Sequence, residues 1–299
     1  MAKRSRTLLL TDNERNHRHA RYLIDAGALP VRGPWLLGPA DLDSLPARPD
    51  TVVALGAAAV LPAARLREQL GLPGPTPADV HEIASATDLP LAGEVDQDEW
   101  LDAEVCHVDG VAHDGRVTFA TASRCLGNRY DHTVGTGTGA VTIDEAEAGS
   151  LFASAEAAVR RVPVPDGAFH VELFDLATGP VLLSVAAHPP GPLGQALCRA
   201  ATGVDLLAEH IRAGIGRPGV PLPDGAGFAG YWHVPPPKTP RTRLAPALPN
   251  LHGEVVLATL PRPGRILPTE VVVRAGNPAA VLTDLISLRE RLDESVRTT

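Results

Sequence analysis

The sequence predicts an α/β protein that begins with a small parallel unit and continues into a part built mainly from antiparallel strands. Two short apolar runs, 7–11 and 51–55, are each followed by a segment with helical spacing. This alternation of strand and helix favours a parallel sheet in residues 1–75. Further on, turn signals at 113–115 and 175–180 each separate two strand-like runs, which predicts two antiparallel hairpins.

Local signals set the ends of the two helices in the first unit. Asp12 and Asn13 can cap a helix that continues to about Ala26. The second helix should begin at Ala57 and stop at Gly71, because glycine readily takes the left-handed conformation that ends a helix. The first 75 residues therefore predict strand, helix, strand, helix.

The remaining elements follow from periodicity and from proline and glycine content. Apart from the two hairpins, we expect a strand at 141–143 and helices at 151–161 and 202–214. Residues 218–249 are crowded with proline and glycine, which predicts a connection rather than regular structure. Two more strands should follow at 254–259 and 270–273, and a closing helix at 278–296 with Asn277 as its cap.

Composition excludes several classes of function. The formal net charge is −8 and the basic residues are scattered, so the chain should repel nucleic acid and anionic membranes. No stretch approaches the ~18 apolar residues that suggest a membrane span. The three cysteines show no CxxC spacing, which argues against a disulfide framework and a zinc knuckle. We therefore expect a cytoplasmic protein with reduced thiols.

Several motifs in a fixed order are similar to those of a known superfamily. They are VVAL at 52–55 with LGLPGP at 70–75, EVCHVDG at 104–110, GAFHVELF at 167–174 with LSVAAHPPG at 183–191, and GVDL at 203–206. Together they resemble the ATP-grasp superfamily, in particular its carboxylate-amine ligases of the peptide-ligase type. The likeness covers most of the chain.

The resemblance implies a division of the chain. Residues 1–75 would form a preATP-grasp-like α/β domain, and 76–103 a shortened connection where the family has its ATP-binding lid. Residues 104–224 would be a reduced ATP-grasp-like α+β core with a mainly antiparallel sheet. Residues 225–299 would supply the proline-rich connection and a C-terminal strand and helix subdomain. Family members are commonly dimers, so the resemblance also implies a homodimer.

The segment that should hold ATP departs from the family pattern. The resemblance implies two phosphate-binding lysines between residues 75 and 104, but the 28 residues at 76–103 contain no lysine, no arginine and one glycine, Gly93. Each missing cation costs about 4 kcal/mol of attraction to a phosphate at ~4 Å and an effective dielectric of 20. We therefore expect that this chain does not use ATP in the family's manner.

The metal-binding hairpin of the family also departs from its pattern. The resemblance implies magnesium ligands at Glu172 and at the position of Ser184, and a phosphate-binding arginine where His188 stands. Only Glu172 fits. Because Mg²⁺ is usually held by carboxylates together with substrate phosphates, we expect no family-type magnesium site.

Strand alternation nevertheless brings polar side chains of this hairpin to one face. His170 and Glu172 share a face of one strand, and Ser184 and His188 share a face of its partner. These four residues are candidate catalytic groups, and His170, Glu172 and His188 could bind a transition metal. The alternative is that they only satisfy one another's hydrogen bonds in a decayed cavity.

A second strand extends the candidate site. His107 and Asp109 alternate onto one face, and together with Arg124 they are candidate substrate-binding residues. Cys125 beside His132 is a candidate nucleophile, although free cysteines more often behave as small buried hydrophobic residues.

These observations leave two classes of function open. In the first, the chain is a degenerate ligase-like protein of small-molecule or peptide biosynthesis, acting as a non-catalytic partner of an active ligase or binding a carboxylate or amino-acid-derived metabolite. In the second, it is an ATP-independent cyclase, lyase or hydrolase that uses the remodelled hairpin. Residual ATP-dependent ligase activity is a third alternative. The C-terminal strands and the helix at 278–296 could supply the interface of a homodimer.

Overall fold

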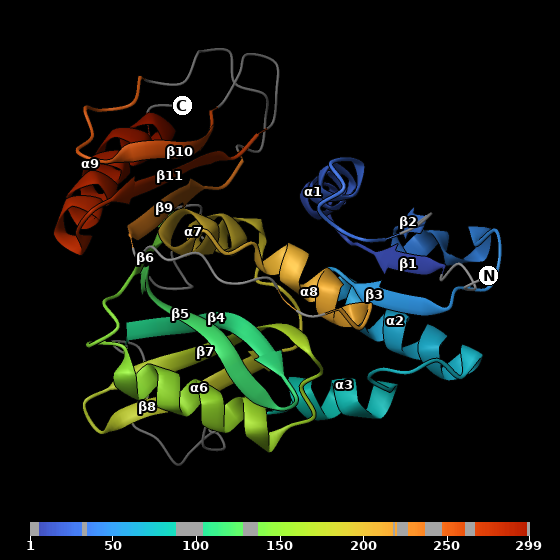
Figure 1. The fold of residues 1–299 in the computed structure, drawn as a ribbon. Helices are drawn as coiled ribbons and strands as arrows, with labels where there is room; N and C mark the ends of the chain where they lie inside the picture. Colours follow the sequence, from blue (N-terminus) through green and yellow to red (C-terminus); the bar gives the residue numbers. More distant parts are fainter. Residues whose placement is uncertain are drawn as a thin grey trace.

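The N-terminal unit is a parallel sheet, as the sequence predicts, but it has three strands where two were expected. The computed structural model describes residues 6–31, 35–87, 104–127, 137–217, 219, 227–236, 247–260 and 267–297. Strands β1 (Thr7–Leu10), β2 (Trp35–Leu37) and β3 (Thr51–Ala54) form the sheet in the order β2-β1-β3. The unit lies beside the larger part of the molecule (Figure 1).

The two helices predicted for this unit begin and end where their capping residues stand. Asn13 caps α1 (Glu14–Asp25) by accepting a hydrogen bond from the Asn16 amide. Helix α2 (Ala57–Leu70) ends at Gly71, whose φ of 60° is the left-handed value expected there. The structure adds a short 3₁₀ helix, η1 (Pro39–Ser44), that the sequence did not reveal.

Part of the segment assigned to the missing lid folds into a helix. Helix α3 (Pro77–Ala84) was not predicted, although Thr76 and Asp79 form the reciprocal capping contacts typical of a helix start. It packs on α2 and on β8 of the larger sheet. The rest of the segment, residues 88–103, lies outside the described residues.

The larger part of the chain is built on one eight-stranded sheet in the order β10-β11-β9-β6-β5-β4-β7-β8. Every pairing in it is antiparallel. Both predicted hairpins are present, and Asp114 (φ 50°) and Gly115 (φ 69°) form the first turn. The strands are β4 (Glu104–His113), β5 (Arg116–Leu126), β6 (Thr138–Thr142), β7 (Gly167–Leu176), β8 (Gly179–Ala186), β9 (Phe228–Val234), β10 (Glu254–Thr259) and β11 (Thr269–Ala275).

One prediction for this part was wrong, and another missed a helix. Strand β9 lies inside the stretch expected to lack regular structure, yet it pairs with both β6 and β11 in the middle of the sheet. The helix expected at 202–214 is present as α8 (Leu206–Gly214), but α7 (Pro192–Thr202), which precedes it across Gly203 with φ 78°, was not predicted. Glycine and proline do not prevent regular structure here, because β9 contains Gly230 and α7 begins at Pro192 and contains Gly194.

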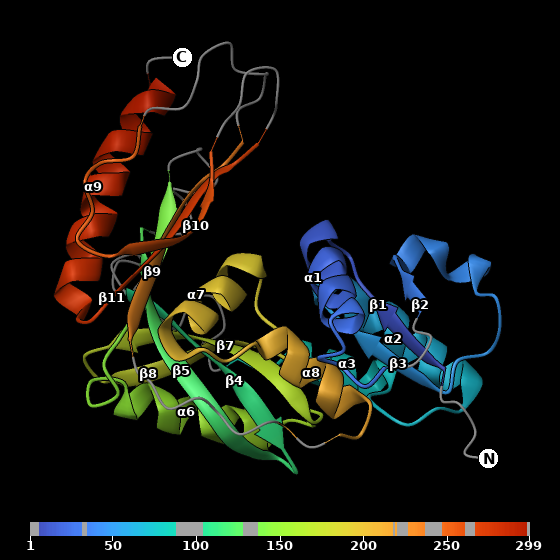
Figure 2. The ribbon, with the colours of Figure 1, turned by 45° about the horizontal axis from the view of Figure 1, so that its top comes forward.

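Helices cover both faces of the large sheet. Helices α6 (Gly149–Arg161) and α9 (Pro278–Arg297) pack on one face, and α7 and α8 pack on the other (Figures 1 and 2). Asn277 caps α9, as predicted. Among the described helices, none combines the length and the apolar composition that a membrane crossing requires.

Helix α8 also joins the two sheets. Leu207 and Ile211 on this helix pack into the core beneath α1, together with Leu9 and Val53 of the small sheet. On the same helix, the buried His210 donates from Nε2 to the carbonyl of Ala54 in β3 (2.8 Å). Its Nδ1 accepts a hydrogen bond from the backbone amide of Ala168 in β7 (3.1 Å).

Candidate functional site

The register of strands β4, β7 and β8 brings most of the predicted site residues together. Asp109 stands opposite His170, and His107 stands opposite Glu172. Glu172 stands in turn opposite Ser184 on β8. Because paired residues point to the same face, these five side chains share the sheet face that α7 and α8 cover.

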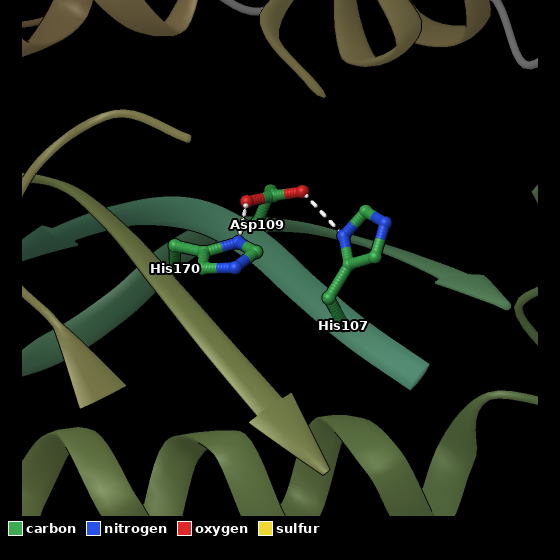
Figure 3. A group of neighbouring side chains, drawn as sticks. All are labelled: His107, Asp109 and His170. Carbon is green, nitrogen blue, oxygen red and sulfur yellow. Dashed lines mark hydrogen bonds and ion pairs between the residues drawn. The ribbon is translucent and has the colours of Figure 1, made fainter. Parts of the chain in front are cut away.

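Three of these side chains form a hydrogen-bonded group centred on Asp109 (Figure 3). One carboxylate oxygen of Asp109 lies 2.7 Å from Nδ1 of His107, and the other lies 2.7 Å from Nδ1 of His170. Asp109 is only 1% exposed, and the His107 residue is 6% exposed. The two imidazole rings are 5.4 Å apart between centroids. The carboxylate therefore fixes the orientation of both rings.

The electrostatics of this group follow from a carboxylate buried between two imidazoles. Burial by itself would raise the pKa of Asp109, but the neighbouring His170 and His107 hold it well below its usual range. Burial by itself would lower the pKa of His170, but the charges and hydrogen bonds of Asp109 and Glu172 raise it to about 10. Without another cation in the group, His170 is therefore a positively charged side chain at neutral pH.

Glu172 continues the polar network toward β8. Its Oε2 accepts a hydrogen bond from the Ser184 hydroxyl (2.7 Å), and its Oε1 lies 3.8 Å from Nε2 of His170. The resemblance implied a magnesium site here, but the structure supplies one carboxylate, one hydroxyl that already donates to that carboxylate, and an imidazole. This donor set does not fit Mg²⁺, which prefers several oxygen ligands in octahedral geometry.

Two predicted residues are not part of this group. His188 lies beyond the end of β8, where its Nδ1 is 2.8 Å from the Pro189 carbonyl and burial lowers its pKa. Arg124 lies opposite Cys106 in the register, on the sheet face that carries α6. Its guanidinium pairs with Glu104 and Glu147, at 2.7 Å each, so it does not reach His107 or Asp109.

A cavity of about 690 Å³ opens in front of this network. It lies between the start of α1, the first turn of α7 and the large sheet, and His107, His170 and Glu172 line one side of it. Cys125 also lines it, whereas His132, the partner suggested for Cys125, lies outside the described residues. The remaining lining residues are Asn13, Glu14, Arg15, Arg18, Pro190, Gly191, Pro192, Leu193, Gly194, Tyr231, His233, Leu267 and Glu270.

Sequence patterns did not reveal the opposite wall of this cavity. Glu270 of β11 is 4% exposed, contacts the guanidinium of Arg15 on α1, and lies 3.4 Å from Nδ1 of His233 on β9. Burial would raise the pKa of Glu270, but His233 and Arg15 lower it. A signal existed in the strand TEVVV, where a lone carboxylate precedes three buried valines. Its two partners stand on other elements, far away in the sequence, so pattern alone could not identify them.

The cysteines play different structural roles. Cys106 and Cys198 are buried free thiols, and burial raises the pKa of Cys106 to about 11 and that of Cys198 to about 12. These two therefore stay protonated and act as small core residues. Cys125 is half-buried at the edge of the cavity.

Comparison with known proteins identifies the fold. No family model matches the chain, and no curated protein matches it. Among solved structures, the L-amino acid ligase from Bacillus licheniformis aligns with a TM-score of 0.65 and 12% identity over 97% of this chain and 98% of the ligase chain.

Two enzymes that act on other substrates align equally well. Phosphoribosylglycinamide synthetase from Anaerococcus prevotii has a TM-score of 0.68 and 8% identity over 96% of this chain and 98% of its own. N5-carboxyaminoimidazole ribonucleotide synthetase from Thermus thermophilus has a TM-score of 0.64 and 14% identity over the same shares. The architecture described above is therefore an ATP-grasp-like fold, which this chain shares with these three enzymes.

Proposed function

We propose that this chain binds a small amino-acid-derived metabolite in the cavity between α1 and the large sheet, without using ATP in the manner of the ligases. The observation that carries the proposal is the charge pattern of the cavity, which places Glu172 on one wall and the Arg15–Glu270 pair on another. An amino acid carries one group of each sign. A volume of about 690 Å³ is within the range of small-molecule sites.

In this proposal each wall has a role. Glu172 is a hydrogen-bond acceptor for the substrate's ammonium group, and Ser184 holds its carboxylate in place. Arg15 is the guanidinium that receives the substrate's carboxylate, which is a geometry this side chain recognises well. One of the solved structures that share this fold is an L-amino acid ligase.

The stretch 76–103 and the hairpin of β7 and β8 argue against the use of ATP. The stretch 76–103 has no lysine or arginine to neutralise a triphosphate. Its described part is occupied by α3, and the hairpin that would hold magnesium offers Glu172 as its carboxylate beside Ser184. The metabolite is therefore expected to bind equally well with and without ATP and Mg²⁺.

Isothermal titration of the purified chain with L-amino acids and dipeptides tests this proposal. We expect saturable binding that ATP and Mg²⁺ leave unchanged. Glu172→Gln should weaken binding at least tenfold, because a charge-assisted hydrogen bond contributes about 1.5–3 kcal/mol. The control is Arg116→Gln, on an exposed hairpin end, which should bind like the parent chain. Failure of every ligand to bind, or equal binding by Glu172→Gln, would refute the proposal.

A second candidate function is an ATP-independent enzyme that moves a proton on the bound metabolite. The specific observation in its favour is that Asp109 orients His170, whose Nε2 lies 3.8 Å from Glu172 at the cavity wall. A carboxylate-oriented imidazole beside a second carboxylate is an arrangement suited to general acid–base catalysis. Exchange of the metabolite's α-hydrogen in D₂O, followed by NMR, would detect it. Unchanged exchange in His170→Gln would exclude a role for His170.

A further inference from the structure

The group formed by His107, Asp109 and His170 has a donor set that binds transition metals. Two imidazole nitrogens and one carboxylate offer ligand atoms that all lie within 4.8 Å of one another. The sequence suggested a different set, His170 with Glu172 and His188, but the structure puts His188 outside the group and Asp109 at its centre. We propose that His107, Asp109 and His170 hold a divalent transition-metal ion at the wall of the cavity.

Distances within the group support direct ligation. Ligands bonded at about 2.0–2.2 Å to a tetrahedral or octahedral ion lie roughly 2.9–3.5 Å from each other. In the structure, Nδ1 of each imidazole is 2.7 Å from its carboxylate oxygen. Rotations of the three side chains would therefore bring both Nδ1 atoms and one carboxylate oxygen around a single ion, which releases the hydrogens that these nitrogens donate to the carboxylate.

The burial of the Asp109 carboxylate favours binding of a positive ion. Asp109 is 1% exposed, and a buried carboxylate requires compensating positive charge. A divalent ion between the two imidazoles would provide that charge in place of the proton of the imidazole, together with bonds to both rings. Strands β4 and β7 hold all three side chains, so little side-chain freedom is lost on binding.

The donor set also selects the class of ion. Two histidines with one carboxylate suit Zn²⁺, Co²⁺ or Fe²⁺ better than Mg²⁺ or Ca²⁺, which prefer oxygen ligands. Three protein ligands leave positions open toward the cavity, as in sites where a metal contacts water or a substrate. The ion would therefore be accessible to a carboxylate-containing ligand.

A second group in the chain provides a contrast. His113, Asp114 and Asp166 also lie within 4.8 Å of one another, and their side chains are 61%, 87% and 37% exposed. The first two stand at the hairpin turn between β4 and β5, and Asp166 directly precedes β7. Asp166 already accepts a hydrogen bond from the Asp114 amide. Such an exposed group holds an ion weakly and serves as an internal control.

The test uses the full chain without a polyhistidine tag, stripped with a chelator. It is then titrated with Co²⁺ under visible absorption, and loaded separately with Zn²⁺ for metal analysis after gel filtration. We expect one equivalent of tightly held Zn²⁺ and d–d absorption bands from a Co²⁺ site of low coordination number. Less than about a tenth of an equivalent of Zn²⁺, with no Co²⁺ bands, would overturn the proposal.

Variants assign the ion to its ligands. His170→Gln should weaken Co²⁺ binding at least tenfold, and Asp109→Asn should do the same if circular dichroism shows that it folds. His170 is the safer change because its side chain is 22% exposed. His113→Gln should leave binding unchanged. Equal Co²⁺ affinity in His170→Gln and the parent chain, or loss of the ion in His113→Gln alone, would refute the assignment. Because these titrations contain only metal, their outcome is independent of whether the chain binds an amino-acid-derived metabolite.

Discussion

His210 should make the stability of this protein depend on pH. The residue is buried at the junction of the two sheets, where its ring donates to the Ala54 carbonyl and accepts from the Ala168 amide. Burial lowers its pKa from the ordinary 6.5 to about 4. Since Nδ1 must accept a hydrogen bond, the folded protein needs this imidazole neutral, whereas the unfolded chain protonates it below pH 6.5. The contribution of neutral His210 to the free energy of unfolding is therefore fully present above pH 6.5 and is lost as the pH falls toward 4.

The size of the effect follows from the two pKa values. A fall from 6.5 to about 4 corresponds to roughly 3 kcal/mol, at about 1.4 kcal/mol per tenfold change in proton affinity. Part of that loss develops above pH 5. Linkage therefore predicts that the free energy of unfolding falls by about 2 kcal/mol between pH 7.5 and pH 5. Other groups also titrate in this interval, and a comparison with a variant removes their contribution.

His210→Gln is the matched variant, because the amide can donate to one backbone group and accept from the other without titrating. Urea unfolding at pH 7.5 and pH 5 gives the free energy of unfolding for both proteins. The parent chain should lose about 2 kcal/mol more than the variant over this interval. His81→Gln, at an exposed position on α3, should behave like the parent chain. Equal losses in the parent chain and His210→Gln would show that this histidine does not govern the response.

Three further predictions concern packing, capping and the contact between α1 and the sheet. Gly110→Ala should lower the free energy of unfolding by about 3 kcal/mol or more, because an added Cβ would lie 2.2 Å from the Phe119 carbonyl and 2.6 Å from the Phe169 ring. In the same denaturant assay Gly149→Ala, which meets nothing within 4 Å, should be neutral or slightly stabilising. Asn13→Ala should cost about 1 kcal/mol by removing the cap of α1, and a loss below about 0.3 kcal/mol in thermal unfolding would contradict that role. Glu270→Gln, which removes the negative charge that faces Arg15, should speed amide hydrogen exchange in α1 but not in α9; unchanged exchange in α1 would mean that this ion pair does not hold the helix.

Local signals predicted much of the fold because they act within a few residues. The Asn13 cap, the Gly71 stop and the Asp114–Gly115 turn each depend on the conformation that one or two residues prefer, and the structure has all three. Strand β9 escaped prediction for the opposite reason. Its central place in the sheet is set by β6 and β11, which are distant in sequence, and the prolines and glycines around it hid its short apolar pattern.

In the candidate site, too, local patterns were predictable from the sequence and long-range contacts were not. Alternation predicted that His107 and Asp109 share one strand face and that His170 and Glu172 share another. It could not predict that Asp109 meets His170 across 61 positions, because that contact depends on the pairing of β4 with β7. The face on which Arg124 lies also depends on the register of a pairing, in this case between β4 and β5.

The position of β9 has a consequence for how the protein is made. This strand (Phe228–Val234) pairs with β6 (Thr138–Thr142). During translation, β6 therefore lacks this neighbouring strand until about 90 more residues have left the ribosome. Long-range antiparallel pairing of this kind slows folding, and an open strand edge is prone to pair with other chains. The nascent chain should therefore complete its central sheet only near the end of synthesis, and overexpression should benefit from slow translation or from a chaperone that shields β6.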